Sequence, residues 1–289
     1  MHYLITGAGG QLGKEWVLYA GENGLSFSAY TSSRLDITDK TRVAEVLESE
    51  SPDVVINCAA YTKVDKAESD REKAFYVNEE GVKNLAVSCK KSGIKMVHYS
   101  TDYVFPGELE DRKKYPDGYP ENAECKPVNV YGASKRAGEV ALEESGCDYL
   151  LIRVSWLCGR HGGNFVKTML RLAKERDEIS VVDDQFGSPS FTFDVARKSD
   201  TLLKQNTNGM YHISSSGLIS WADYAEQIFL ESGMSTSVKR ITTAEFPTEA
   251  KRPAYSLLSN KKMENAGIKP LDWKDGLGRL LRQLKEDEN

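Results

Sequence analysis

The chain of 289 residues lacks the features that mark several classes of protein. No apolar run approaches the ~18 consecutive residues of a membrane-spanning helix, so no membrane span is expected. The first residues pass from an apolar stretch into glycines, without the charged and long apolar segments of a secretory signal. Lys and Arg number 38 against 43 Asp and Glu, with no basic block, which disfavours binding to nucleic acid or to an anionic membrane surface.

Cysteine and histidine are also scarce. The five cysteines, an odd number, include no CxxC pair, and there are only four histidines. A disulfide framework and a zinc site are therefore not expected. This use of cysteine predicts a cytoplasmic location. The hydrophobic content of 40% and the charged content of 28% are ordinary for a globular protein. The length suits one large domain or two smaller ones.

Short apolar runs alternate with longer amphipathic ones over the first 155 residues. Most of the apolar runs are apolar on both faces of a strand, which is typical of a parallel sheet covered by helices on each side. The expected strands are 2–8, 25–32, 52–60, 94–105, 147–157 and 209–215, and the expected helices between them are 11–20, 40–50, 68–92 and 134–144. This alternation predicts a doubly wound α/β fold of the Rossmann type.

The pattern changes after Trp156, where strands become sparse. Two amphipathic helices are expected at 164–176 and 220–232, the second with Ser220 as its N-cap. The charged residues 285–289 are expected to form a frayed end.

These patterns predict two domains. Residues 1–155 should form a dinucleotide-binding domain, to which a strand near 209–215 returns, and residues 156–289 should form mostly a smaller substrate-binding lobe. Residues 107–127 make a long loop, which is typically functional or mobile.

A glycine-rich turn follows the first expected strand. Gly7, Gly10 and Gly13 form GxxGxxG at the start of a helix. A turn without Cβ atoms lets backbone N–H groups approach a pyrophosphate at the helix N-terminus, so the turn predicts a dinucleotide site. Any tight strand-to-helix turn can be rich in glycine, and the position directly after the first strand is what favours the functional interpretation.

The end of the second expected strand bears on the choice of cofactor. An NAD site usually has an acidic residue there for the ribose 2′-hydroxyl. Residues 29–34 carry no carboxylate, but they include Ser32 and Arg34, which suit a 2′-phosphate. NADP(H) is therefore favoured and NAD(H) is left open, since Asp36 becomes a ribose ligand if the strand runs further.

Tyr131 and Lys135 form a YxxxK pair at the start of an expected helix. Residues four apart lie on one face of a helix, and a lysine ammonium there would lower the pKa of the tyrosine towards that of a general acid. Thr101, with Ser100 as the alternative, ends the fourth strand, at the edge where open α/β sheets bind ligands. There it would hydrogen-bond a carbonyl oxygen beside Tyr131, unless these hydroxyls only satisfy the backbone of a turn.

Ten segments, in order along nearly the whole chain, carry a closer resemblance. They are TGAGGQLG (6–13), LDITD (35–39), INCAAYTKVDKAE (56–68), STDYVF (100–105), PVNVYGASK (127–135), RVSWL (153–157), GGNFVKTML (162–170), VVDDQFGSPS (181–190), GMYHISSSGLISWADYA (209–225) and KRPAYSLLSNKK (251–262). With them the chain resembles the dTDP-4-dehydrorhamnose reductases, a family of extended short-chain dehydrogenases/reductases. The resemblance implies reduction of the C4 ketone of dTDP-4-dehydro-L-rhamnose by NAD(P)H, the last step to dTDP-L-rhamnose for surface polysaccharide.

The resemblance also implies roles for individual residues. For the cofactor it implies Gly10, Gln11 and Leu12 at the pyrophosphate, Asp36 and Ile37 at the adenine, and Ala59, Ala60 and Tyr61 after the third strand. For catalysis it implies Tyr131, Lys135 and Thr101. For the sugar nucleotide it implies Thr101, Asp102 and Trp156, with Asn164, Gln185 and Arg252 as further candidates, the last because a diphosphate needs cationic donors.

Some members of the family bind Mg²⁺ at a dimer interface through two groups of carboxylates. Glu15 matches the first position, but the second segment, 190–194, has one acid, Asp194, where a metal-binding version has more. We therefore expect no metal, with Glu15 left as the candidate ligand, and both a monomer and a homodimer remain open.

The predicted reaction is a reduction in which NADPH supplies a hydride to the ketone carbon and Tyr131 supplies a proton to the oxygen. Lys135 would hold the nicotinamide ribose, and Thr101 would stabilise the developing alkoxide. Two alternatives stay open: another nucleotide-sugar enzyme such as an epimerase or a dehydratase, and a non-catalytic NADP-binding regulatory subunit. A dehydratase usually has an acid pair after the threonine, whereas here Tyr103 follows Asp102.

Overall fold

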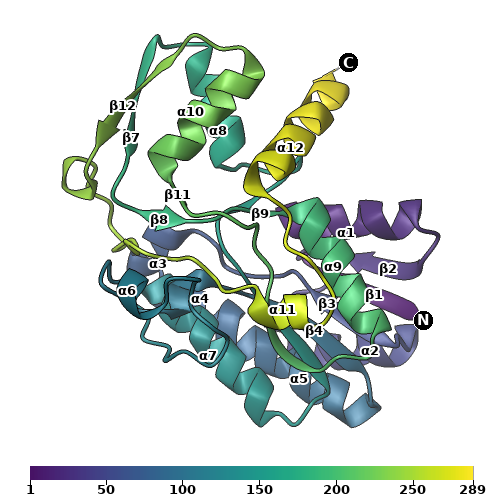
Figure 1. Cartoon of the computed structure of the whole chain (residues 1–289). Helices are drawn as coiled ribbons and strands as arrows, with labels where there is room; N and C mark the ends of the chain where they lie inside the picture. The colour runs from purple at the N-terminus through teal and green to yellow at the C-terminus, as the bar shows by residue number, and fades with distance from the viewer. Residues whose placement is uncertain (289) are drawn as a thin grey trace.

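The computed structural model describes residues 1–288, with side chains through residue 287. A six-stranded parallel sheet, in the order β10-β5-β4-β3-β1-β2, forms the larger part of the molecule (Figure 1). Its strands are β1 (His2–Thr6), β2 (Ser26–Tyr30), β3 (Val54–Asn57), β4 (Lys95–Thr101), β5 (Tyr149–Val154) and β10 (Gly209–His212). These are the six strands predicted from the apolar runs, each shorter than predicted at its carboxyl end.

Helices cover both faces of this sheet, as the apolar strands require. On one face α1 (Gln11–Glu22) lies beside α9 (Thr192–Lys204), and Trp16 and Val195 share a core with the strands. The other face carries α2 (Lys40–Glu50), α5 (Gly81–Ser92) and α7 (Val130–Glu144), with Val43, Leu85 and Leu142 in its core. The predicted doubly wound α/β fold is confirmed.

Two predicted helices differ most from those in the structure. The single helix predicted at 68–92 is divided into α3 (Val64–Ser69), α4 (Arg71–Phe75), a π-helical segment (Tyr76–Glu80) and α5. Helix α7 begins at Val130 instead of residue 134, because the Asn129 side chain caps it by accepting a hydrogen bond from the N–H of Gly132 (2.8 Å).

A smaller lobe lies above the sheet domain in Figure 1. It contains α8 (Phe165–Ala173), α10 (Trp221–Ser232), α12 (Trp273–Glu288) and the parallel pair β7 (Glu178–Val182) and β12 (Ser237–Ile241), packed around a core of their own. Ser220 caps α10, as predicted. The frayed end predicted for 285–289 is wrong as far as residue 288, because α12 packs its apolar face on this core and Asp287 pairs with Arg160; residue 289 lies outside the described residues.

The remaining short elements lie in the connecting segments. They are β6 (Leu157–Cys158), β8 (Phe186–Gly187), β9 (Ser190–Phe191), β11 (Ile219–Ser220), α6 (Asp111–Lys114), α11 (Lys261–Asn265) and two 3₁₀ turns, Asp102–Val104 and Thr243–Glu245. The long loop 107–127 lies against the segment 254–259, since Tyr119 N–H donates to the Leu257 carbonyl and its own carbonyl accepts from Ser259. The loop is thus bonded into the structure on one side.

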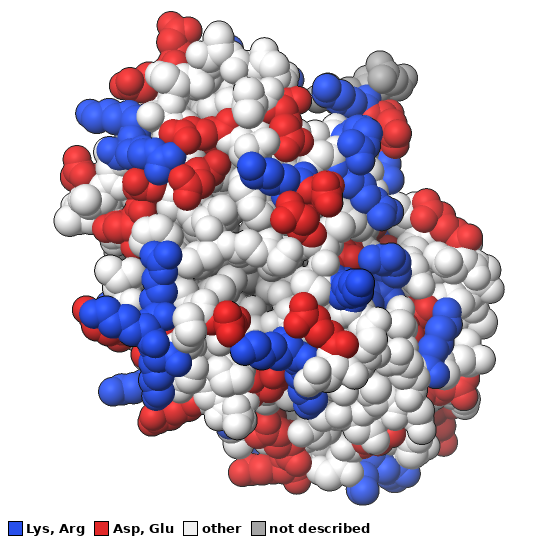
Figure 2. Space-filling view, in the orientation of Figure 1, with Lys and Arg blue, Asp and Glu red and all other residues white. Residues whose placement is uncertain are grey.

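Figure 2 shows one face of the molecule, hollowed between the lobe and the sheet domain, with basic and acidic side chains interspersed around it. Within residues 1–288, no helix is long and apolar enough to cross a membrane.

Candidate active site

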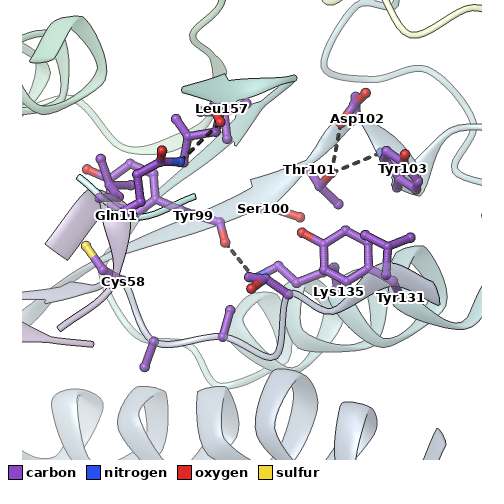
Figure 3. A pocket seen from close by; sticks show the side chains of 18 of the residues that line it. Gln11, Cys58, Tyr99, Ser100, Thr101, Asp102, Tyr103, Tyr131, Lys135 and Leu157 are labelled. Carbon is purple, nitrogen blue, oxygen red and sulfur yellow. Dashed lines mark hydrogen bonds between the residues drawn. The ribbon is translucent and has the colours of Figure 1, made fainter. Parts of the chain in front are cut away.

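A pocket of about 540 Å³ lies where the central strands end, between the sheet domain and the lobe (Figure 3). Its wall is built from the glycine turn, the ends of β3 and β4, the start of α7 and the segment after β5. The predicted site residues that line it are Gly10, Gln11, Leu12, Ala59, Ala60, Thr101, Asp102, Tyr131, Lys135 and Trp156. The doubly wound topology brings them together, because the carboxyl ends of parallel strands share one edge.

The three glycines of the turn serve different purposes. Gly7 has a positive φ of 63°, and a Cβ on it would lie 2.5 Å from the Ala59 nitrogen. A Cβ on Gly13 would lie 2.2 Å from the Gly7 carbonyl oxygen. These two glycines therefore allow the turn to pack closely, and Gly10, with Gln11 and Leu12, faces the pocket.

The residues predicted at the adenosine end lie outside the pocket lining. Ser32, Arg34 and Asp36 are exposed, and the Arg34 guanidinium lies 4.8 Å from the centre of the Tyr30 ring. Asp36 accepts hydrogen bonds from the backbone and hydroxyl of Thr38, a local turn contact. Ile37 is buried. Their contacts with a cofactor stay predictions.

Tyr131 stands at the inner wall beside Thr101 (Figure 3). Burial raises the pKa of Tyr131, and the nearby Asp102 carboxylate raises it further. The Thr101 hydroxyl donates to Asp102 Oδ1 (2.8 Å), and burial raises the pKa of Asp102 to about 7. The other carboxylate oxygen, Oδ2, is buried without a hydrogen bond in the described part of the chain, so a polar atom is left for a ligand.

The pKa of Tyr131 is raised in this structure, whereas the sequence predicted that Lys135, whose amine is engaged by other groups, would lower it. The Lys135 Nζ donates to the Tyr99 carbonyl oxygen (2.7 Å) and lies 3.4 Å from Nε2 of His98. Burial lowers the pKa of Lys135 to about 8, although Glu139 acts in the opposite direction. The phenol of Tyr131 is therefore protonated near neutral pH and is suited to donate a proton.

Trp156 forms an aromatic wall of the pocket. Its backbone has a φ of 46°, which is uncommon for a residue other than glycine. The indole stacks on Trp221 (3.6 Å between ring centres, 12° between planes) and donates to the Ser256 hydroxyl (3.2 Å). Nothing in the sequence pattern marked Trp221 as the support of Trp156, because the two residues are brought together by the lobe.

Three predicted residues are engaged elsewhere. Tyr61 is buried and its hydroxyl donates to Asp70 (3.1 Å). Asn164 caps α8 and donates to Gln11 Oε1 (2.8 Å), so it contacts a pocket residue without lining the pocket. Gln185 donates to the Thr243 hydroxyl (3.0 Å).

Arg252 lies next to the pocket but is already paired. Its guanidinium donates to Asp65 (2.6 Å) and to the hydroxyl of Tyr103 (3.3 Å), a pocket residue. To bind a diphosphate, Arg252 would have to exchange the Asp65 carboxylate for a phosphate oxygen.

The candidate metal ligand Glu15 is buried and accepts a hydrogen bond from the Thr192 hydroxyl (2.8 Å). Burial raises its pKa, which favours the protonated form. Asp194, in the second segment, pairs with Arg197 and Lys198. Within residues 1–288, no three His, Cys, Asp or Glu side chains gather as a metal site, and this donor set does not fit Mg²⁺.

Several pocket residues were not predicted. They are Asn57, Cys58, Thr62, Val64, Tyr99, Tyr103, Val154, Leu157, Gly162 and Gly163; Ser100, the alternative to Thr101, also lines the pocket. Most of them lie near or just after the carboxyl end of a strand, so a rule that searched every strand end would have found them. Gly162 and Gly163 reach the pocket only through tertiary structure.

The site can be compared with known proteins. A family profile described as the RmlD substrate binding domain matches residues 1–286. The dTDP-4-dehydrorhamnose reductase of Aggregatibacter actinomycetemcomitans is 42% identical, with 95% of this chain and 96% of that protein aligned. The dTDP-4-keto-6-deoxy-D-glucose reductase of Streptomyces niveus is 36% identical, with 99% of each aligned.

A crystal structure of dTDP-4-dehydrorhamnose reductase from Bacillus anthracis in complex with NADP superposes with a TM-score of 0.93. It is 40% identical and covers 98% of this chain and 99% of its own. Since the match of sequence and of structure extends over nearly the whole length, the chain belongs to the dTDP-4-dehydrorhamnose reductase family of extended short-chain dehydrogenases/reductases.

Proposed function

We propose that this chain reduces the C4 ketone of dTDP-4-dehydro-L-rhamnose to dTDP-L-rhamnose with NADPH. The observation that carries the proposal is that Thr101, Tyr131 and Lys135 meet in one pocket that begins at the glycine turn. Membership of the family supports the substrate, and the related structure with NADP supports the cofactor. The same proposal places the reaction in the cytoplasm.

Tyr131 is the proton donor of the proposed reaction. The reduced oxygen must receive a proton, and a buried phenol with a raised pKa retains one across the neutral range. Thr101 hydrogen-bonds the same oxygen as negative charge develops on it. Lys135 holds the ribose next to the nicotinamide, which when bound supplies the hydride.

The cofactor lies along the strand ends in this proposal. Backbone N–H groups at Gln11 and Leu12, at the start of α1, hold the pyrophosphate next to Gly10, whose own N–H donates to the Gly7 carbonyl oxygen (2.9 Å). Gly7 and Gly13 keep this turn compact. The residues proposed for the adenosine end are Ser32, Arg34, Asp36 and Ile37, and those proposed to line the cofactor after β3 are Ala59, Ala60 and Tyr61. Arg34 is exposed at the end of β2 and can approach a 2′-phosphate.

The sugar nucleotide lies between the lobe and the sheet domain. Asp102 offers a carboxylate oxygen to a sugar hydroxyl, and Trp156 offers an aromatic face. Arg252 is proposed for the diphosphate, with Asn164 and Gln185 as further candidates to contact the sugar nucleotide. In this division residues 1–155, with the strand near 209–215, bind NADPH, and residues 156–289 bind most of the sugar nucleotide.

The test measures the oxidation of NADPH by absorbance, first with dTDP-4-dehydrorhamnose and then with its UDP and GDP analogues. The expected result is fast oxidation with the dTDP sugar and formation of dTDP-L-rhamnose, identified by NMR. Redox-neutral conversion would indicate an epimerase. A lack of turnover with every substrate, together with a co-purifying enzyme, would indicate a regulatory subunit.

A second candidate substrate is dTDP-4-keto-6-deoxy-D-glucose, favoured by the relative of that name from Streptomyces niveus. It presents the same ketone to the same three residues and differs in the configuration of the ring. Comparison of kcat/KM for the two dTDP sugars decides between them, because specificity is the ratio of these values.

A further inference from the structure

A row of polar side chains runs behind Lys135, across three neighbouring strands. Thr6 on β1, Asn57 on β3 and His98 on β4 lie in register, so their side chains lie side by side. All three residues are buried, and none was predicted from the sequence. The row ends at the Lys135 Nζ, 3.4 Å from His98 Nε2.

The orientation of the Asn57 amide is determined by its neighbours. Its Oδ1 accepts from the backbone N–H of Ala59 (3.1 Å), a group that can only donate, and from the hydroxyl of Thr6 (2.7 Å). The Nδ2 must therefore be the atom that faces His98 Nδ1, at 3.0 Å. An amide nitrogen only donates, so His98 Nδ1 accepts.

This contact decides where the imidazole proton lies. Burial, together with the charge of Lys135, places the pKa of His98 well below its ordinary value, so the ring is neutral. A neutral imidazole has one N–H, and Nδ1 is already an acceptor, so the proton is on Nε2. That N–H faces the amine of Lys135.

We propose that His98 is a positioning residue that favours the neutral amine form of Lys135, by directing its Nε2–H at the Lys135 Nζ. A neutral amine can accept this hydrogen bond, whereas an ammonium has only donors. The Tyr99 carbonyl accepts from the same Nζ and holds it in place in either form (Figure 3). The inference rests on the proposed function only in taking Lys135 to be part of the active site.

The other groups that face Lys135 act in both directions. Glu139, one turn further along α7, favours the ammonium, while burial opposes it. Cys58, directly after β3, is a neutral thiol near pH 7, because burial raises its pKa. Tyr131, one turn earlier on α7, is a neutral phenol near pH 7, because its pKa is raised. The His98 N–H thus adds to burial against Glu139.

The first experiment measures the tautomer of His98 directly, in the full-length protein. Nitrogen-15 NMR of the imidazole distinguishes a protonated ring nitrogen from an unprotonated one, and the His98 signals are assigned by their loss in His98→Leu or, if that variant does not fold, in His98→Gln. The expected result at pH 7 is an unprotonated Nδ1 and a protonated Nε2. A proton on Nδ1, or on both nitrogens, would overturn the proposal.

The second experiment follows the titration of the Lys135 Cε signal by carbon-13 NMR, assigned by its loss in Lys135→Arg. In His98→Leu the midpoint should rise by about one pH unit, a tenfold gain in proton affinity. His212→Leu is the matched control, because His212 is also buried and neutral but lies on β10, and it should leave the midpoint unchanged. An unchanged midpoint in His98→Leu, or equal shifts in both variants, would overturn the proposal.

Asn57→Asp keeps the size of the side chain and reverses the direction of the hydrogen bond between residue 57 and His98 Nδ1. A carboxylate accepts from His98 Nδ1–H, so Nε2 should lose its proton, or the ring should become doubly protonated, with a higher Lys135 midpoint in either case. If His98 in this variant still carried its proton on Nε2 alone, the proposed control of its tautomer by Asn57 would be contradicted. None of these measurements needs a sugar substrate, so they stand or fall separately from the turnover assay of the proposed function.

Discussion

Two buried residues that can carry a charge lie one turn apart on α7, and they differ in whether their hydrogen-bond partners are ionised. Glu139 is 0% exposed and accepts two hydrogen bonds from the Arg153 guanidinium, each 2.8 Å long, with Arg136 as a further partner. Although burial alone would raise the pKa of Glu139, Arg153 lowers it. Lys135 is 2% exposed and is held by a neutral carbonyl and a neutral imidazole, and burial lowers its pKa to about 8.

The difference separates a structural charge from a functional one. A buried ion pair with complete hydrogen bonding keeps its charge and joins α7 to β5. A buried amine without an ionised partner changes its protonation state near neutral pH, which is a property of groups that take part in chemistry. Tyr131, Lys135 and Glu139 are spaced four apart, so α7 passes from the pocket into the core along one face.

The largest effect is expected from Tyr131→Phe, at the pocket end of this face. Removal of the phenol oxygen removes the proton donor, and kcat should fall by about 10³-fold. Binding of NADPH, measured by fluorescence titration, should change by less than about threefold, since the ring is retained. Turnover close to that of the wild type would show that another group donates the proton.

Glu139→Gln tests the residue at the other end of this helix face, in the core. It leaves the buried Arg153 charge without its partner, so the free energy of unfolding in urea should fall by about 3–5 kcal/mol. The matched control is Glu143→Gln, one turn further on, where a partly exposed carboxylate lies 3.5 Å from Arg136 and a loss below about 1 kcal/mol is expected. Equal losses in the two variants would show that the buried carboxylate of Glu139 stabilises the fold no more than the partly exposed carboxylate of Glu143.

Lys135→Met tests whether the buried amine destabilises the fold at neutral pH. The folded pKa of about 8 is below the ordinary value of ~10.4, so between these values the unfolded chain binds more protons. The stability of the wild type relative to Lys135→Met should therefore rise by about 3 kcal/mol between pH 7 and pH 10.5. The comparison at equal pH cancels the other titrating groups, and a constant difference would mean that the lysine pKa is not lowered.

The smallest effect is expected at the surface of the lobe. Arg240 pairs with Asp183, Asp223 and Glu226, a larger ion-pair network than that of Arg153, but it is 40% exposed. Solvent screens such pairs, so Arg240→Ala should lower the free energy of unfolding by less than about 1 kcal/mol. A loss as large as that of Glu139→Gln would show that the number of partners matters more than burial.

The sheet and its order of elements were predictable because parallel strands buried on both faces are continuous apolar runs, such as VVIN in β3. The glycine turn and the YxxxK pair were predictable because each is a local pattern with a local geometry. Helices α9 and α12 were missed. Their packing surfaces are completed by distant segments, since α9 lies on α1 and α12 on α10.

The sequence predicted which residues lie at the site, but it did not predict their charge interactions or their proton affinities. The sequence placed Tyr131 and Lys135 on one face, and the expectation of mutual influence followed from that. In the structure the Tyr99 carbonyl and His98 engage the Lys135 amine, both from β4, more than 30 positions earlier in the chain. No spacing rule connects these residues.

The sequence by itself determined the α/β class, the six strands of the sheet and the edge at which the pocket forms, because hydrophobic periodicity and turn glycines act over a few residues. Only the tertiary structure decided which of the buried charges are paired and which residues support Trp156. Burial and partner geometry come from segments that are remote in the chain, and proton affinity depends on both.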